Sequence, residues 1–159
     1  MEAVQNILSV RGMFRLQLGE DENGKPKIMG DSGWKKNEVM NDGFQNYICA
    51  LIGSLGGSVQ VQAMCIGTGG VPNVTDSLLP GSVKRQSCGK AIVASKTLRC
   101  TLSIASGDHP GGTPDIANIA LINSTASAGT IMCGNTFDSS TWNSNQGLSA
   151  TYDLVFATA

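Results

Sequence analysis

His109 is the residue in this chain best suited to acid–base catalysis, because it is the only histidine. It follows Asp108 in a loop rich in proline and glycine, 107–115. A Ser–His or Cys–His mechanism requires an imidazole held within hydrogen-bond reach of its nucleophile. Such a loop is an unusual support for a rigid imidazole, so we expect no catalytic role for His109. The spacing alone leaves a hydrolase open as a rival hypothesis.

Two other patterns raise the question of a site. Paired carboxylates cleave glycosidic bonds, but the acidic residues here cluster in stretches typical of turns, where such side chains are usually solvated. The string 67–70, Gly-Thr-Gly-Gly, has neither the capped helix nor the Lys-Ser/Thr pair of a phosphate-binding loop after it. We interpret both patterns as turn chemistry.

The cysteines give no metal-binding pattern. Their number is odd and no two have a C-x-x-C spacing; they are Cys49, Cys65, Cys88, Cys100 and Cys133. A zinc site would need paired ligands and more than one histidine. We interpret them as free thiols that act as small buried hydrophobic side chains. The sequence therefore predicts no catalytic, cofactor-binding or metal site.

Composition narrows the function classes. Charged residues are 14% of the 159 residues, and the formal net charge is −1, so there is no field to attract nucleic acid or an anionic membrane. We find no apolar run of about 20 residues, as a membrane span would need. We also find no signal-peptide pattern at the N-terminus. We expect a single domain, made and folded in a cytosol.

The periodicity of apolar residues predicts one helix in a mainly β chain. Phe44, Ile48, Leu51 and Leu55 share one helical face, so we expect a short α-helix at about residues 42–55. Alternating or continuous apolar patterns predict strands over 10–18, 27–29, 59–66, 97–105, 116–122, 130–137 and 148–156. The fold that we predict is an antiparallel two-sheet β-sandwich or flattened barrel, with residues 1–9 as an extended N-terminal arm or a first strand.

Several short motifs occur in an order that resembles a known group of proteins. They are Trp34-x-x-Asn37, Asn41-x-Gly43, Ile66-Gly67-Thr68-Gly69, Pro72, Thr75-Asp76-x-x-Leu79, Ile116-x-Asn118-Ile119-Ala120-Leu121, Gly129-Thr130, Phe137 and Leu148-x-x-Thr151-Tyr152-x-Leu154-x-Phe156. Together they resemble small virion structural proteins of tailed bacteriophages, of the head-decoration (cement) or tail-associated type. Asn118 is a departure, since such proteins often carry an acidic residue there. The resemblance covers roughly Trp34 to the C-terminus, and no functional residue carries over from it.

The resemblance implies a non-enzymatic assembly protein of the virion. Its partners would be the major capsid protein or tail proteins, and it would be a homo-oligomer, for which a trimer is one expectation. We expect the arm 1–9 and the loop 107–115 to make the contacts, because neither has a role in the core. Two rival classes stay open: the hydrolase, and a receptor- or carbohydrate-binding module with Trp34 and Trp142 exposed side by side.

Overall fold

The structure is a computed structural model that describes residues 8–22, 25–41, 43, 47–48, 51, 59–94 and 96–158. The described elements are ten strands and one 3-10 turn, η2 (Ser106–Asp108). The strands are β1 (Leu8–Glu22), β2 (Lys25–Asp31), β3 (Lys35–Val39), β4 (Ala63–Gly67), β5 (Ser82–Ser87), β6 (Gly89–Ala94), β7 (Thr97–Ile104), β8 (Asp115–Ile122), β9 (Ile131–Thr141) and β10 (Gly147–Thr158).

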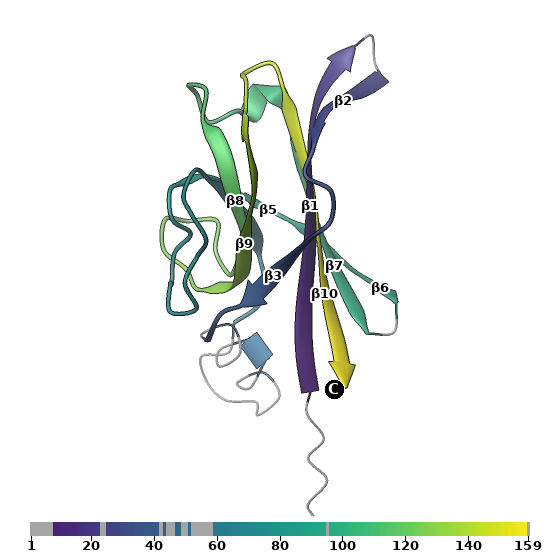
Figure 1. The fold of residues 1–159 in the computed structure, drawn as a ribbon, viewed down its shortest axis with the longest axis vertical. Helices are drawn as coiled ribbons and strands as arrows, with labels where there is room; N and C mark the ends of the chain where they lie inside the picture. Colours follow the sequence, from purple (N-terminus) through teal and green to yellow (C-terminus); the bar gives the residue numbers. More distant parts are fainter. Residues whose placement is uncertain are drawn as a thin grey trace, which may run out of the picture.

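The strands form one antiparallel sheet that bends into two layers. Their order is β5-β4-β8-β9-β3-β1-β10-β7-β6, with β2 added beside β1. Strand β3 joins the layers, because its first half pairs with β1 and its second half, Glu38 and Val39, pairs with β9; Figure 1 shows it crossing from one layer to the other. At the opposite side the consecutive strands β5 and β6 belong to different layers, with Cys88 between them. The sheet is therefore a nearly closed, flattened barrel, and the predicted mainly β fold is confirmed.

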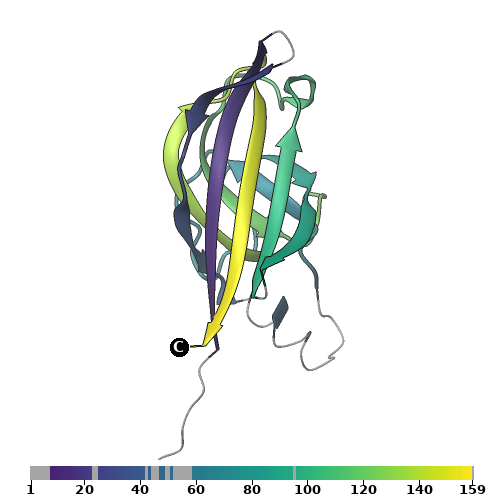
Figure 2. The same cartoon turned by 90° about the vertical axis from the view of Figure 1, so that its right-hand side faces the viewer.

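The core lies between the two layers. Strands β1 and β10 pair over twelve positions and run side by side along the whole molecule (Figure 2). Their inward positions alternate as the sequence predicts, and the ring of Phe14 stacks on that of Tyr152 with centroids 5.6 Å apart. Strand β8 lies between β4 and β9 and is almost wholly buried, as its continuous apolar sequence predicts.

Several predicted boundaries change, and the strand predicted over 59–66 begins only at Ala63. Strand β1 continues to Glu22, four residues beyond the predicted end at residue 18, and pairs there with Lys25. At the other end β1 begins at Leu8, so Leu8 and Ser9 are strand residues opposite Thr158 and Ala157. Residues 1–7 of the predicted arm lie outside the described residues.

The predicted helix at 42–55 also lies largely outside the described residues, which include only positions 43, 47, 48 and 51 of it. No helix among the described residues is long and apolar enough to cross a membrane. The sequence reading missed β3, which follows Trp34 and leads into this segment. Its pairing with β1 depends on Gly12, because a Cβ there would lie 1.7 Å from Asn37 Oδ1.

Candidate interaction surfaces

The loop 107–115 is exposed but held firmly at its base by His109. The backbone N–H of Gly111 donates to His109 Nδ1 over 3.0 Å, so the ring proton lies on Nε2, which donates to the carbonyl of Trp142 over 2.9 Å. The imidazole also contacts the buried indole of Trp142 edge-on, with centroids 4.7 Å apart. Both ring nitrogens are thus engaged by the backbone. In this structure His109 holds the loop.

Further contacts fix the two ends of the loop. The backbone N–H of Trp142 donates to Pro114 O over 2.9 Å, and Thr141 Oγ1 donates to Asp115 Oδ1 over 2.6 Å. Gly111 and Gly112 have φ values of 93° and 67°, a backbone that side-chain-bearing residues rarely adopt. The loop therefore presents a preformed surface, which lowers the ordering cost of any contact that it makes.

Strand β6 is the most exposed apolar element among the described residues. All six of its residues are exposed, and Ile92 and Val93 keep 80% and 47% of their surface accessible. The strand lies at the end of the strand order, beside β7. Its one charged side chain, Lys90, is turned back onto the protein, where Nζ donates to Val61 O over 2.8 Å. Exposed apolar edges of this kind are usually protected by outward charges, or else are covered by a partner.

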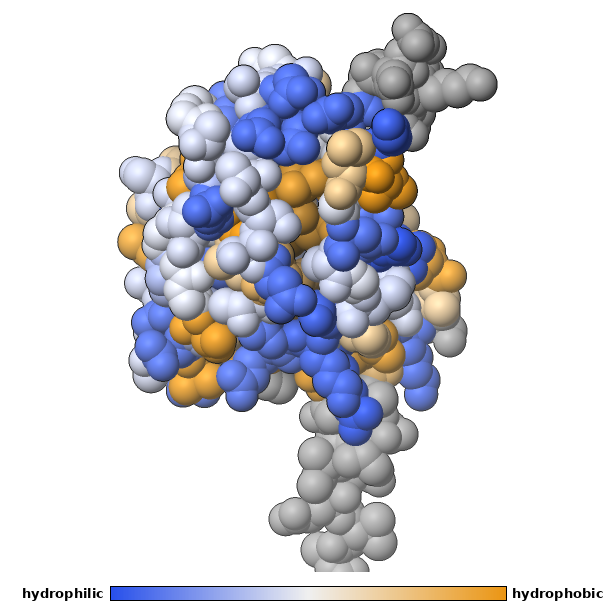
Figure 3. Space-filling view, turned by 45° about the horizontal axis from the view of Figure 1, so that its top comes forward, coloured by the Kyte–Doolittle hydropathy of each residue, from blue (hydrophilic) through white to orange (hydrophobic). Residues whose placement is uncertain are grey.

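The β1–β2 hairpin forms a second projecting element. Its strand β2 carries Ile28 and Met29, which are 58% and 52% exposed, and Figure 1 shows it standing clear of the barrel. A hollow of about 640 Å³ lies beside it, between β1 and the turn region of η2 and β10. The floor of the hollow includes the buried Leu18, Ile104 and Leu148, and Figure 3, which turns this end forward, shows apolar residues in a hollow between polar ones.

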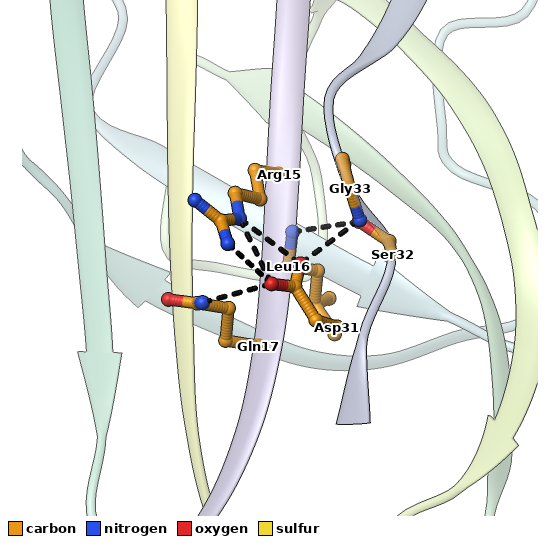
Figure 4. A network of polar contacts seen from close by, with 6 residues as sticks. All are labelled: Arg15, Leu16, Gln17, Asp31, Ser32 and Gly33. Atoms are coloured by element: carbon orange, nitrogen blue, oxygen red, sulfur yellow. Dashed lines mark hydrogen bonds and ion pairs between the residues drawn. The ribbon is translucent and has the colours of Figure 1, made fainter. Parts of the chain in front are cut away.

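A polar network holds the base of this hairpin (Figure 4). Arg15 Nε donates to Asp31 Oδ1 over 2.9 Å, Gln17 Nε2 donates to Asp31 Oδ2 over 3.1 Å, and the backbone N–H of Gly33 donates to Oδ1 over 2.9 Å. The hydrogen bond from Arg15, supported by those from Gly33 and Gln17, holds the pKa of Asp31 well below its usual value. The network orients the hairpin relative to the barrel.

The two tryptophans lie in different environments. Trp34 is 43% exposed, and the guanidinium carbon of Arg99 lies 6.0 Å from its ring centroid. Arg99 is itself fixed by a two-pronged hydrogen bond to Asp153, at 2.8 and 2.7 Å. Trp142 is fully buried, and its Nε1 donates to Gln146 O over 2.9 Å. The exposed pair of tryptophans that a sugar platform would need is therefore not formed.

Two asparagines of the sequence motifs, Asn118 and Asn37, form hydrogen bonds that hold neighbouring segments together; we call these contacts clamps. Asn118 is fully buried, and its Nδ2 donates to Gly70 O over 3.0 Å and to Pro80 O over 2.9 Å, which fixes the turn after β4. A Cβ on Gly67 would lie 2.5 Å from Asn118 Oδ1, so glycine is needed there. Asn37 Nδ2 likewise donates to the Tyr152 hydroxyl over 2.5 Å. Sequence reasoning missed these clamps, although an Asn inside the apolar run of β8 was a visible signal.

The four described cysteines, Cys65, Cys88, Cys100 and Cys133, are free thiols and buried. Burial raises the pKa of Cys65, whose Sγ lies 2.9 Å from Ser82 Oγ, and raises that of Cys133 to about 12. Among the residues that the structure describes, no three His, Cys, Asp or Glu side chains are grouped so as to hold a metal ion.

Comparison with known proteins identifies no relative. No protein-family model matches the chain, and neither the curated proteins nor the solved structures contain a significant match.

Proposed function

We propose that the chain is a non-enzymatic virion structural protein of a tailed bacteriophage, which decorates or cements the capsid through repeated symmetric interfaces. The observation that carries this proposal is the exposed apolar edge of β6, where Ile92 keeps 80% of its surface accessible. An exposed apolar edge whose only lysine is hydrogen-bonded back to Val61 O favours a protein partner over solvent. The motif order, which resembles that of phage virion proteins, supports the same class.

The mechanism would be burial of surface, repeated by the symmetry of the particle. Each specific contact of this kind buries about 1,000 Å² or more, and symmetric copies add their contributions. The β6 edge would meet the major capsid protein or another copy of this chain. The loop 107–115 offers a second contact with little ordering cost, because His109 and Trp142 already fix it. An oligomer such as a trimer would place several β6 edges on one particle site.

An incorporation assay tests the proposal. The test variant is Ile92→Lys, with Ser127→Lys as a matched control, because Ser127 is also exposed and lies in the turn before β9. Purified protein is added to particles from a phage that lacks its own copy of the gene, and bound protein is measured after sedimentation. We expect the wild type and Ser127→Lys to bind, and Ile92→Lys to lose roughly tenfold or more in binding. Failure of the wild type to bind any particle fraction would reject the virion role.

The same assay separates the alternative, a tail-associated structural or adaptor protein. Particles are disrupted into head and tail fractions before the bound protein is measured. Recovery with heads supports decoration, and recovery with tails supports the adaptor role. A variant that lacks residues 1–7 tests the arm without removing any residue of β1.

A further inference from the structure

The thiols of Cys88 and Cys100 lie together where the chain crosses between the two layers, from β5 to β6; we call this crossing the seam. Cys88 is the residue between β5 and β6, where the chain passes from one layer to the other, and Cys100 lies on β7. Both side chains belong to one buried cluster, in which Cys88 is 9% exposed and Cys100 is fully buried. The backbone N–H of Cys88 donates to Gln62 O over 3.2 Å, which fixes its position against the segment before β4.

A lysine ammonium lies beside this pair. Lys90 is directly opposite Cys100 in the register of β6 and β7, and is two residues from Cys88. Its Nζ donates to the carbonyl of Val61, the neighbour of the residue that binds Cys88. The position of the charge is therefore set by the fold.

The surroundings make the two thiols unequal. A hydrogen bond from the Cys100 thiol, helped by the charge of Lys90, lowers the pKa of Cys88 below its usual value. The same hydrogen bond, together with burial, raises the pKa of Cys100. A reactive thiolate beside a protonated partner thiol is the arrangement that forms a disulfide in two steps.

We propose that Cys88 and Cys100 are an oxidation site, at which hydrogen peroxide converts the two thiols into a reversible intramolecular disulfide. The Cys88 thiolate attacks one peroxide oxygen, the O–O bond breaks, and Cys88 sulfenic acid and, after proton uptake, water are formed. The Cys100 sulfur then attacks the Cys88 sulfur, the S–O bond breaks, and the Cys100 proton leaves with the hydroxide as a second water. Two thiols are oxidised and one peroxide is reduced to two waters.

The burial of Cys88 and Cys100 limits which oxidant can reach them, and their position determines what a disulfide between them would do. Because Cys88 is only 9% exposed, a small peroxide fits the site better than a bulky disulfide reagent. The other two described thiols are less suited, because burial raises the pKa of both Cys65 and Cys133. The new bond would tie the β5–β6 crossing to β7 and strengthen the seam. This site goes beyond the proposed virion role and does not depend on it.

Peptide mapping of the wild-type protein tests the proposal without any variant. The protein is treated with hydrogen peroxide, free thiols are blocked with iodoacetamide, and the chain is cleaved with trypsin and then chymotrypsin. Trypsin releases Cys88 on the short peptide 86–90, and chymotrypsin separates Cys100 from Cys133. We expect a peptide that joins Cys88 to Cys100, two hydrogens lighter than its reduced parts, which dithiothreitol reverses. The melting temperature should rise by roughly 4–12 °C.

Two variants sharpen the result. Cys65→Ala should keep the cross-link, and Cys88→Ala should leave Cys100 free to react with iodoacetamide after unfolding. In the wild type, the free thiol of Cys88 should react with peroxide roughly tenfold or more faster than that of Cys65. Peroxide that oxidises Cys88 to sulfinic acid without joining it to Cys100, or that reacts with Cys65 first, would overturn the proposal.

Discussion

Replacing Asn118 by Asp would test the clamp that holds the turn after β4. The two side chains have nearly the same shape, but the change removes the NH₂ group that donates to Gly70 O and Pro80 O. A carboxylate cannot donate to either carbonyl. Because Asn118 is fully buried, water cannot replace the lost donor without opening the structure.

The size of the effect follows from these two contacts. Each hydrogen bond contributes about 1 kcal/mol net, and each buried carbonyl left without a donor costs about 1–3 kcal/mol. A buried carboxylate facing two carbonyl oxygens also loses solvation and is repelled. We expect Asn118→Asp to lower the free energy of unfolding by about 3–5 kcal/mol at neutral pH.

The loss should depend on pH in a defined direction. Burial and the carbonyls raise the pKa of the new carboxyl in the folded state above its unfolded value of about 3.9. The folded state then binds a proton more tightly, so the variant loses stability as pH rises through this window. Below it, the protonated carboxyl donates to one carbonyl, and the deficit shrinks.

Urea unfolding of both proteins between pH 4 and pH 8 measures the effect. Asn143→Asp is the matched control, because it makes the same change at an exposed position, and it should alter stability by less than about 0.5 kcal/mol. A loss at Asn118 that is equally small, or that grows as pH falls, would refute the clamp.

Three further changes test other contacts. Gly12→Ala should cost about 2–3 kcal/mol, because the new Cβ meets Asn37 Oδ1, and urea unfolding should show partial recovery when Asn37→Ala is added. Asp31→Asn should be less stable than the wild type at neutral pH. The difference should shrink progressively as pH falls below about 4, because the contribution of Asp31 is complete above its unfolded pKa and is lost as pH falls towards the lowered pKa of the folded state; urea midpoints against pH measure this. His109→Ala should lower the free energy of unfolding by about 1–2 kcal/mol and speed proteolysis within 107–115, with unchanged far-UV circular dichroism. A loop that stays resistant to proteolysis would contradict the role of His109 in holding it.

Much of the β architecture could be predicted because alternation directly reports a half-buried strand. The inward positions of β7 and β10 follow this rule, and the unbroken apolar run of β8 indicates its central place. Strand β3 could not be predicted, because its sequence, Lys-Lys-Asn-Glu-Val, is mostly polar. It forms because it pairs with β9 and lies against β1 at Gly12, both far away in the sequence. The pattern of residues within β3 gives no information about these distant partners.

The surfaces could be predicted only in part: the loop 107–115 was expected to make contacts, whereas strand β6 was not among the predicted strands. That loop is exposed, but nothing in its sequence showed that His109 would reach the Trp142 carbonyl 33 residues away. The nearness of Cys88 and Cys100 likewise depends on the register of β6 and β7. Such pairings are set by tertiary structure, which spacing along one chain does not record.

The number of copies of this protein in purified phage particles tests the proposed role most directly. Quantitative mass spectrometry against labelled standards, with the major capsid protein as internal reference, gives that number. A decoration protein should be present at on the order of hundreds of copies per particle, in a fixed ratio to the capsid protein. A handful of copies would point to the tail, and absence from particles while the protein accumulates in infected cells would contradict the virion role.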